Sequence, residues 1–226
     1  MKASPLQNFA VRRRAFTLIE LLVVISIIAV LAGILLPVTG SVMENARKTS
    51  AKSTESQIVT AVKSFQSDYG VYPALSTTTA NNDTTVGGTA SNAELFRVLR
   101  ATDAATGSPN TRRIPYFEGK DVKTPAKPKD GFATTGGTGN NGGTVAVGDL
   151  VDPWGNVYFV RYDSGYTEQV NNPYAGGGAD DGGGAYTPTT MLRTGVISWS
   201  YGKDGKLGKN GTGTVTNIGD DVLSWQ

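Results

Sequence analysis

The chain has 226 residues and contains neither cysteine nor histidine. Without cysteine it has no disulfide bonds and no thiol nucleophile, and without histidine it lacks His-based catalytic triads and ordinary zinc sites. Any metal site must therefore be built from oxygen atoms, which calcium and magnesium prefer as ligands. The sequence also has no paired acids embedded in an apolar pocket pattern, so it does not predict an enzyme. Its length fits one modest domain and an anchor.

An excess of positive charge is missing from most of the chain. The sequence holds 21 Lys and Arg against 19 Asp and Glu, but its first 15 residues contain four basic residues and no acid. This leaves 17 basic against 19 acidic residues downstream. The four are Lys2, Arg12, Arg13 and Arg14. They predict a cytoplasmic start to the chain and do not indicate a nucleic-acid surface.

A long apolar run follows this basic start. Between Phe16 and Val38 only Thr17, Glu20 and Ser26 are polar. Roughly 20 such residues are enough to cross a bilayer as a helix. Because a lone carboxylate in hydrocarbon costs several kcal/mol, Glu20 is expected to have a partner and a function.

The start of the run resembles a known family. The residues Phe16-Thr17-Leu18-Ile19-Glu20, the basic leader, the uninterrupted run and Pro37 are similar to the processing motif of type IV pilins and type II secretion pseudopilins. The resemblance implies that residues 1–15 are a leader, and that a membrane prepilin peptidase cuts between Ala15 and Phe16. It also implies N-methylation of Phe16. Ala15 departs from the family, which most often has glycine before the cut.

Two other export signals would explain a basic start before an apolar run. An ordinary signal peptide has a shorter apolar core and a small-residue cleavage site, and Leu35-Leu36-Pro37-Val38 offers no such site. A twin-arginine signal could be seen in Arg13-Arg14-Ala15-Phe16. Glu20 inside the run argues against both.

The run continues into an amphipathic helix. An apolar stripe recurs at spacings of three and four residues, and it consists of Ala51, Thr54, Ile58, Ala61 or Val62, Phe65 and Tyr69. The polar residues Lys52, Glu55, Lys63 and Gln66 are placed off this stripe. Gly70 and Pro73 end the helix. Residues 16–70 are therefore expected to form one long helix whose first half is transmembrane, with a kink at Pro37.

The remaining residues, 71–226, predict a head outside the cytoplasm. Ser76–Asn92 is read as a loop, and Ala93–Ala101 as a short helix capped by Ser91 or Asn92. Val157–Tyr162 and Thr194–Tyr201 have strand composition and could pair antiparallel. Two glycine-rich stretches, 131–148 and 165–184, are expected to be surface excursions. The fold class is α+β and pilin-like: a long N-terminal helix packed on a small antiparallel sheet, with a glycine-rich C-terminal loop.

A short turn motif precedes the first of these strands. In Asp152-Pro153-Trp154-Gly155-Asn156, proline and glycine set a tight turn and Asp152 can accept hydrogen bonds from its backbone. The preferred interpretation is a structural turn with a buried tryptophan. The motif also resembles a signature of the major pseudopilin of type II secretion.

Three carboxylates near the C-terminus are candidate metal ligands. Asp204 lies in a glycine-rich turn, and Asp220-Asp221 follows after a glycine-rich spacer that could fold back. Like charges held close repel unless a cation lies between them, and calcium accepts six to eight oxygen ligands. The alternative is a solvated acidic turn. A competing pair, Asp180-Asp181, lies between two glycine triplets and is interpreted as loop.

The pattern D-G-x-x-G, then D-D and a near-terminal tryptophan, resembles the calcium loop of major pseudopilins. The resemblance implies side-chain ligands Asp204, Asp220 and Asp221, with carbonyl ligands from Tyr201 and Lys206. The spacer is longer here than in the family, which leaves open Asn210 and the choice of carbonyls.

The functional hypothesis is a structural subunit that polymerises from the inner membrane into a pseudopilus driving type II protein secretion, stabilised by calcium. Its expected partners are further copies of itself, the prepilin peptidase, other pseudopilins and an inner-membrane assembly platform. It would be a single-pass inner-membrane protein with a periplasmic head, and Glu20 would pair with the methylated Phe16 of a neighbour. The alternatives are a type IV or competence pilin, and a membrane-anchored calcium-binding surface protein that never polymerises.

Overall fold

The structure is a computed structural model. It describes residues 16–76, 78, 83–88, 90–102, 107–122, 126–140, 142–174, 190–208 and 219–225, without the side chains of 34–39. The predicted leader with Ala15 lies outside the described residues. So do the Asp180-Asp181 pair and Asn210, and the side chain of Pro37 is likewise outside them.

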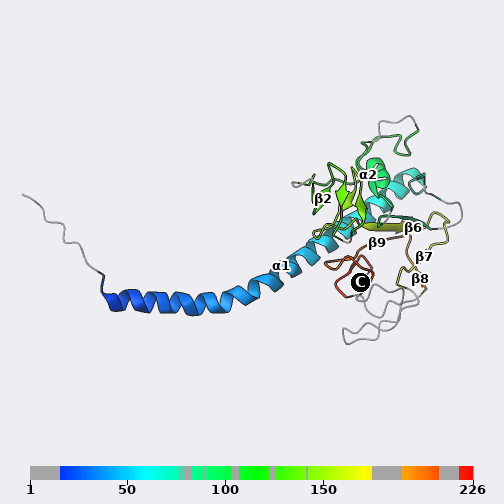
Figure 1. Cartoon of the computed structure of the whole chain (residues 1–226). Coiled ribbons are helices and arrows are strands. Elements are labelled where there is room, and N and C mark those ends of the chain that lie inside the picture. Colours follow the sequence, from blue (N-terminus) through cyan, green and yellow to red (C-terminus); the bar gives the residue numbers. More distant parts are fainter. Residues whose placement is uncertain are drawn as a thin grey trace, which may run out of the picture. The chain divides into compact units, whose positions relative to one another are not determined.

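The first helix, α1, spans Leu18–Tyr69 and has 52 residues (Figure 1). It contributes to both compact units of the chain, Met1–Asn45 and Ala46–Gln226. The predicted end of the helix at Gly70 is confirmed. Gly70 has a φ of +73°, and its N–H donates to the carbonyl of Gln66 at 2.8 Å. Glycine adopts this left-handed conformation without a steric penalty, which stops the helix.

In the first unit the apolar side chains of α1 point to the surroundings. Leu18 is 87% exposed and Ile28 is 57% exposed. Among the residues that the structure describes, no helix is long and apolar enough to cross a membrane.

In the second unit α1 packs one face against the core. Its buried side chains repeat at alternating spacings of four and three residues at Ala51, Glu55, Ile58, Val62 and Phe65, and Ala61 is buried beside Val62. This is the spacing of one face of an α-helix. The apolar members of the predicted stripe are confirmed, with Tyr69 only partly buried.

The sequence prediction for Glu55 was wrong, because it placed this residue on the polar side of the helix. It is fully buried, and neither of its carboxyl oxygens has a hydrogen-bond partner among the described residues. Burial raises the pKa of Glu55 well above its ordinary value, while the positive charge of Lys52 acts in the opposite direction. The prediction failed because the charge of the residue was taken to mean exposure, although its position fits the buried spacing.

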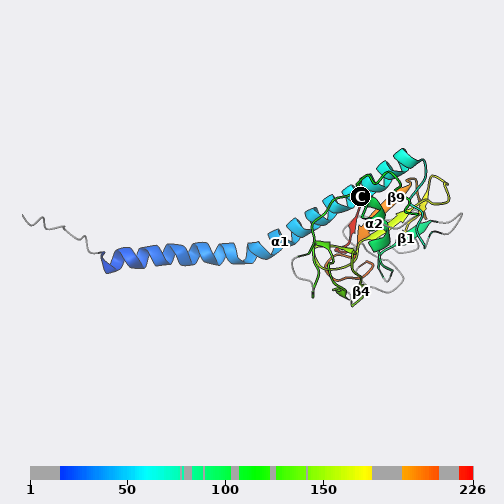
Figure 2. The same cartoon turned by 90° about the horizontal axis from the view of Figure 1, so that it is seen from above.

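The main sheet has four antiparallel strands in the order β1-β6-β9-β10. The strands are β1 (Thr84–Val86), β6 (Phe159–Tyr162), β9 (Val196–Ser200) and β10 (Val222–Leu223). The predicted pairing of the two strand-like segments is confirmed, since β6 and β9 pair from Phe159↔Trp199 to Tyr162↔Val196. Figures 1 and 2 show these two strands near the last turns of α1, where the largest hydrophobic cluster joins helix and sheet.

Strand β1 lies inside the segment that the sequence predicts to be a loop. It is only three residues long, and Val86 is its single strongly apolar residue. A pattern of alternating residues cannot be recognised over such a short length. Its pairing with β6, not its own composition, makes it a strand.

Three two-stranded sheets complete the second unit. They pair β2 (Gly131–Phe132) with β5 (Leu150–Val151), β3 (Gly137–Thr138) with β4 (Thr144–Val145), and β7 (Val170–Asn171) with β8 (Met191–Leu192). Strands β2, β3 and β4 lie in the predicted glycine-rich excursion at 131–148, and β5 follows directly after it. That segment is therefore partly regular, with Phe132 and Val145 buried.

The second helix, α2, spans Ala93–Leu99 and buries Leu95, Phe96, Val98 and Leu99. The hydroxyl of Ser91 accepts the N–H of Ala93 at 3.0 Å, as predicted for a cap. The side chain of Asn92 does not cap the helix. Instead Asp149, far away in sequence, accepts the N–H groups of Asn92 and Ala93 at 2.9 and 3.0 Å.

Candidate functional site

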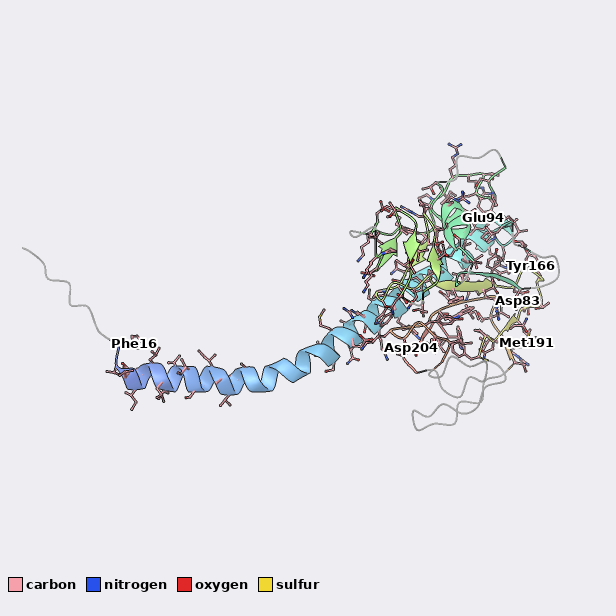
Figure 3. The ribbon with its side chains drawn as sticks, viewed as in Figure 1. Phe16, Asp83, Glu94, Tyr166, Met191 and Asp204 are labelled. Carbon is pink, nitrogen blue, oxygen red and sulfur yellow. The ribbon has the colours of Figure 1, made fainter. Side chains whose placement is uncertain are left out.

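Three carboxylates converge where the last two strands of the main sheet meet. Asp204 lies in the turn after β9, and Asp220 and Asp221 come directly before β10. Because β9 and β10 pair antiparallel, with Val222 opposite Ser200, the two ends of the intervening loop are brought together. One oxygen of each carboxylate lies within 4.8 Å of the others. Figure 3 labels Asp204 in this region.

Each of these carboxylates uses one oxygen for hydrogen bonds among the described residues. Asp204 Oδ1 accepts the N–H of Lys206 at 2.8 Å, and Asp220 Oδ2 accepts the N–H of Asp204 at 2.9 Å. Asp221 Oδ2 accepts the Tyr174 hydroxyl and the N–H of Gly208, both at 2.7 Å. The second oxygen of Asp221 is buried and has no partner in the described structure.

The electrostatics of the cluster are unfavourable without a counter-charge. Burial and, to a smaller extent, the charges of Asp220 and Asp204 together raise the pKa of Asp221 to about 7, although its two hydrogen bonds act in the opposite direction. Burial and the charge of Asp220 likewise raise the pKa of Asp204. A cation between the three groups would remove this repulsion and satisfy the orphaned oxygen of Asp221. The donor atoms are all oxygen, which suits calcium.

The structure brings the three predicted side-chain ligands together, and calcium binding itself remains a prediction. Tyr201 directly follows β9 and Lys206 lies between Asp204 and Gly208, so both stand on the first limb of the loop. Their carbonyl groups stay predicted ligands. Aromatic side chains flank this limb: Tyr201 contacts Phe159 with ring centroids 4.3 Å apart, and Trp225 packs against Trp199 and Tyr174.

The predicted turn at Asp152–Asn156 is confirmed. Asp152 Oδ1 accepts the N–H groups of Trp154, Gly155 and Asn156 at 2.9, 2.6 and 2.8 Å, and Trp154 is 3% exposed. Burial raises the pKa of Asp152 to about 6, against the effect of these hydrogen bonds. The sequence did not predict that Asn156 would reach the acidic loop, where its side-chain amide donates to the carbonyl of Gly202 at 2.6 Å.

At the other end of the chain, the predicted processing residue Phe16 is 80% exposed and precedes the first turn of α1 (Figure 3). The next residue, Thr17, forms a reciprocal helix cap with Glu20 that was not predicted from the sequence. Thr17 N–H and its hydroxyl donate to Glu20 Oε2 at 2.9 and 2.7 Å, and Glu20 N–H donates to the hydroxyl at 3.3 Å. This is a capping box, with the signature of Thr followed three residues later by Glu. Glu20 therefore has an intramolecular role in addition to any assembly contact.

Comparison with known proteins bears on this N-terminal segment alone. No curated protein and no solved structure matches the chain. Residues 11–36 match the family described as the prokaryotic N-terminal methylation motif. The matched stretch contains the predicted processing residues Ala15 and Phe16 together with Glu20. The match supports a type IV pilin-like subunit whose new amino terminus is methylated.

Proposed function

We propose that the protein is a structural subunit of a type IV pilin-like filament, of the kind built by the major pseudopilin of a type II secretion system. The N-terminal methylation motif at residues 11–36 carries this proposal. The exposed apolar side chains of the first half of α1 support it, because a surface of this kind marks a contact with lipid or with other protein chains.

Two features favour the secretion branch over a pilus or competence fibre. The chain has no cysteine, whereas the pilins of such fibres often carry a C-terminal disulfide. The turn at Asp152–Asn156 and the acidic C-terminal loop also resemble those of major pseudopilins. The filament would then assemble from the inner membrane and assist protein transport, with the head in the periplasm.

Calcium is the proposed cofactor of the head. Asp204, Asp220 and Asp221 would supply side-chain oxygens, and Tyr201 and Lys206 would supply carbonyl oxygens. When bound, calcium would link the two limbs of the loop between β9 and β10 and offset the repulsion among the three acids. The residues of the chain would hold the loop ends close to one another in preparation for the ion.

Assembly is proposed to depend on the N-terminus. Removal of residues 1–15 by a prepilin peptidase would create a charged amino group on Phe16, which is then methylated. In the filament this amino group would pair with Glu20 of a neighbouring copy. An ion pair in apolar surroundings fixes register chiefly because leaving either charge alone costs more. Other pseudopilins and an assembly platform would be the remaining partners.

Intact-mass and N-terminal analysis of the protein extracted from membranes tests this function. The expected product begins at Phe16 and carries one methyl group on its amino terminus. A chain that keeps its first 15 residues, or that begins at Phe16 without the methyl group, would contradict the proposal. A chain cut elsewhere in the apolar run would instead indicate an ordinary signal peptide.

A further inference from the structure

A buried hydrogen-bond network connects the turn at Asp152–Asn156 with the acidic loop. Asp152 Oδ2 accepts the hydroxyl of Ser200 and the side-chain amide of Asn156, the latter at 3.3 Å. Asp152, Asn156 and Ser200 are each at most 1% exposed. Since Ser200 is the last residue of β9, the network reaches the point where the chain leaves the sheet and enters the loop.

The network holds both backbone polar groups of Gly202. The N–H of Gly202 donates to the hydroxyl of Ser200 at 3.1 Å, and its carbonyl accepts the side-chain amide of Asn156 at 2.6 Å. A backbone residue whose donor and acceptor are both satisfied by buried side chains has little freedom to move. The first limb of the loop is therefore fixed two residues before Asp204.

Gly202 is also a point at which the two limbs of the loop come into close contact. Its φ is +60°, and a Cβ added there would lie 2.3 Å from the carbonyl oxygen of Asp220. The next two amides, of Lys203 and Asp204, donate to Asp220 Oδ2. The position of Gly202 thus determines how the first limb meets the second.

A second amide side chain holds the same limb from another element. Asn140, which lies between β3 and β4, donates from Nδ2 to the carbonyl of Lys203 at 2.8 Å. Its own N–H donates to the carbonyl of Gly155 at 3.3 Å, so it is tied to the same turn as Asn156. Two asparagines therefore hold the consecutive carbonyls of residues 202 and 203.

We infer that Asn156, oriented by Asp152 and Ser200, is a positioning residue for calcium binding by Asp204, Asp220 and Asp221, and that Asn140 assists it. The inference rests on the proposed calcium site. Neither asparagine need touch the ion, because each acts on the backbone that carries the ligands. Outer groups that orient metal ligands typically change metal affinity by about 10- to 100-fold when they are removed.

The test measures calcium binding and thermal unfolding of the full-length chain kept in solution with mild detergent. The variants are Asn156→Ala and Asn140→Ala. The control is Asn110→Ala, which removes another buried asparagine whose side chain donates to the carbonyls of Val98 and Ile114 at 2.9 and 2.7 Å. Calcium affinity is measured by titration calorimetry. The unfolding midpoint is measured once with excess calcium and once with a chelator.

Asn156→Ala is expected to raise the calcium Kd by about tenfold or more and to shrink the calcium-dependent rise of the midpoint. Asn110→Ala should lower the midpoint by the same amount with calcium and with chelator and leave the Kd unchanged. A merely structural role for Asn156 would produce the behaviour of that control and would overturn the inference. If Asn156→Ala does not fold, the variant Asn140→Ala at the exposed position provides the test. A several-fold higher calcium Kd of this variant supports the inference, and an unchanged Kd overturns it.

The two levels of the proposal fail in different ways. If the wild-type chain shows no calcium binding and no calcium-dependent midpoint, the calcium site is wrong and the inference falls with it. If the wild-type chain binds calcium and the asparagine variants bind it equally well, only the positioning role is wrong. Neither result affects the proposed processing at Phe16.

Discussion

At the scale of single residues, Glu55 is the least expected feature of the chain. A fully buried carboxyl group with no hydrogen-bond partner among the described residues is costly when ionised, so the folded state favours its neutral form. The charged groups that act on it are Lys52 on its own helix and Asp152 and Asp221 on the sheet side. Burial raises the pKa of Glu55 more than the positive charge of Lys52 lowers it, and the negative charges of the two aspartates raise it further.

The raised pKa of Glu55 predicts that this residue makes folding less favourable as the pH rises. Its contribution to stability is fully present below the pKa of the unfolded chain, about 4.3 for glutamate. It is lost progressively as the pH rises toward the higher folded-state pKa. Glu55→Gln cannot ionise. We therefore expect this variant to gain up to about 1.4 kcal/mol over the wild type per pH unit in that window.

Chemical denaturation of the full-length chain at several pH values between 4 and 8, with chelator present, measures this effect. The difference between Glu55→Gln and the wild type should grow with pH. Glu118→Gln, which changes an exposed acid, serves as the control and should give no such trend. Stability curves of Glu55→Gln and the wild type that run parallel across this range would show that Glu55 is not kept neutral by the fold.

At the scale of structural elements, the two limbs of the loop between β9 and β10 carry negative charges that lie close together. Burial is the main cause of the raised pKa values of Asp204 and Asp221, and the negative charge of Asp220 adds to it in both cases. Without a cation, the three acids therefore repel one another. With calcium, the same residues would hold the loop closed. One substitution should therefore have opposite effects under the two conditions.

Asp204→Ala is expected to abolish the calcium-dependent rise in the unfolding midpoint while leaving the chelated protein as stable as the wild type, or slightly more stable. For the wild type, linkage gives about 2.7 kcal/mol of stabilisation at a calcium concentration 100-fold above Kd. Thermal unfolding with calcium and with chelator measures both values. Asp121→Ala, which removes an acid 3.9 Å from Arg100, is the control. An intact calcium response in Asp204→Ala would rule this residue out as a ligand.

At the scale of the whole molecule, the N-terminal end of α1 has to serve both the single chain and the proposed filament. Glu20 completes the capping box with Thr17 in the single chain and would meet the amino group of Phe16 from a neighbour after assembly. Only Oε2 is used in the capping box. The charge and the capping function of this residue can therefore be separated by substitution.

Glu20→Gln should keep the cap, because glutamine also serves at this position of a capping box, but it removes the charge. We expect the variant to be inserted in the membrane and cut after Ala15, yet to form few or no filaments, as would Glu20→Ala. Electron microscopy of sheared filaments and the mass of the extracted protein measure the two outcomes. Thr17→Ser keeps both cap and charge and should assemble. Abundant filaments from Glu20→Gln would show that the carboxylate is not an assembly contact.

The parts of the fold that repeat regularly could be predicted from the sequence, and the parts held by distant contacts could not. The long helix, its end at Gly70 and the pairing of β6 with β9 follow from periodicity, from glycine and from strand composition. Strand β1 exists because β6 is beside it, and α2 takes most of its cap from Asp149, more than 50 residues away. Neither the pairing of β1 with β6 nor the capping of α2 by Asp149 can be recognised from the residues of the segment itself.

The candidate site divides in the same way. The acids Asp204, Asp220 and Asp221 could be singled out because their charge is concentrated between glycines, and their convergence follows from the pairing of β9 with β10. Asn156 could be recognised as part of a turn but not as a partner of Gly202. Amide side chains pair with backbone groups of any residue, so their partners depend on the whole fold.

The order of the main sheet has one more consequence. Strand β10, only two residues long, lies at the edge of the sheet and covers one side of β9, whose five residues are all buried. If the acidic loop opened and β10 left, the backbone N–H and C=O groups along that side of β9 would lose their partners. An uncovered edge strand of this kind is a template on which strands of other chains can add and aggregate. By covering this side of β9, β10 is therefore also expected to protect the head against aggregation with other heads.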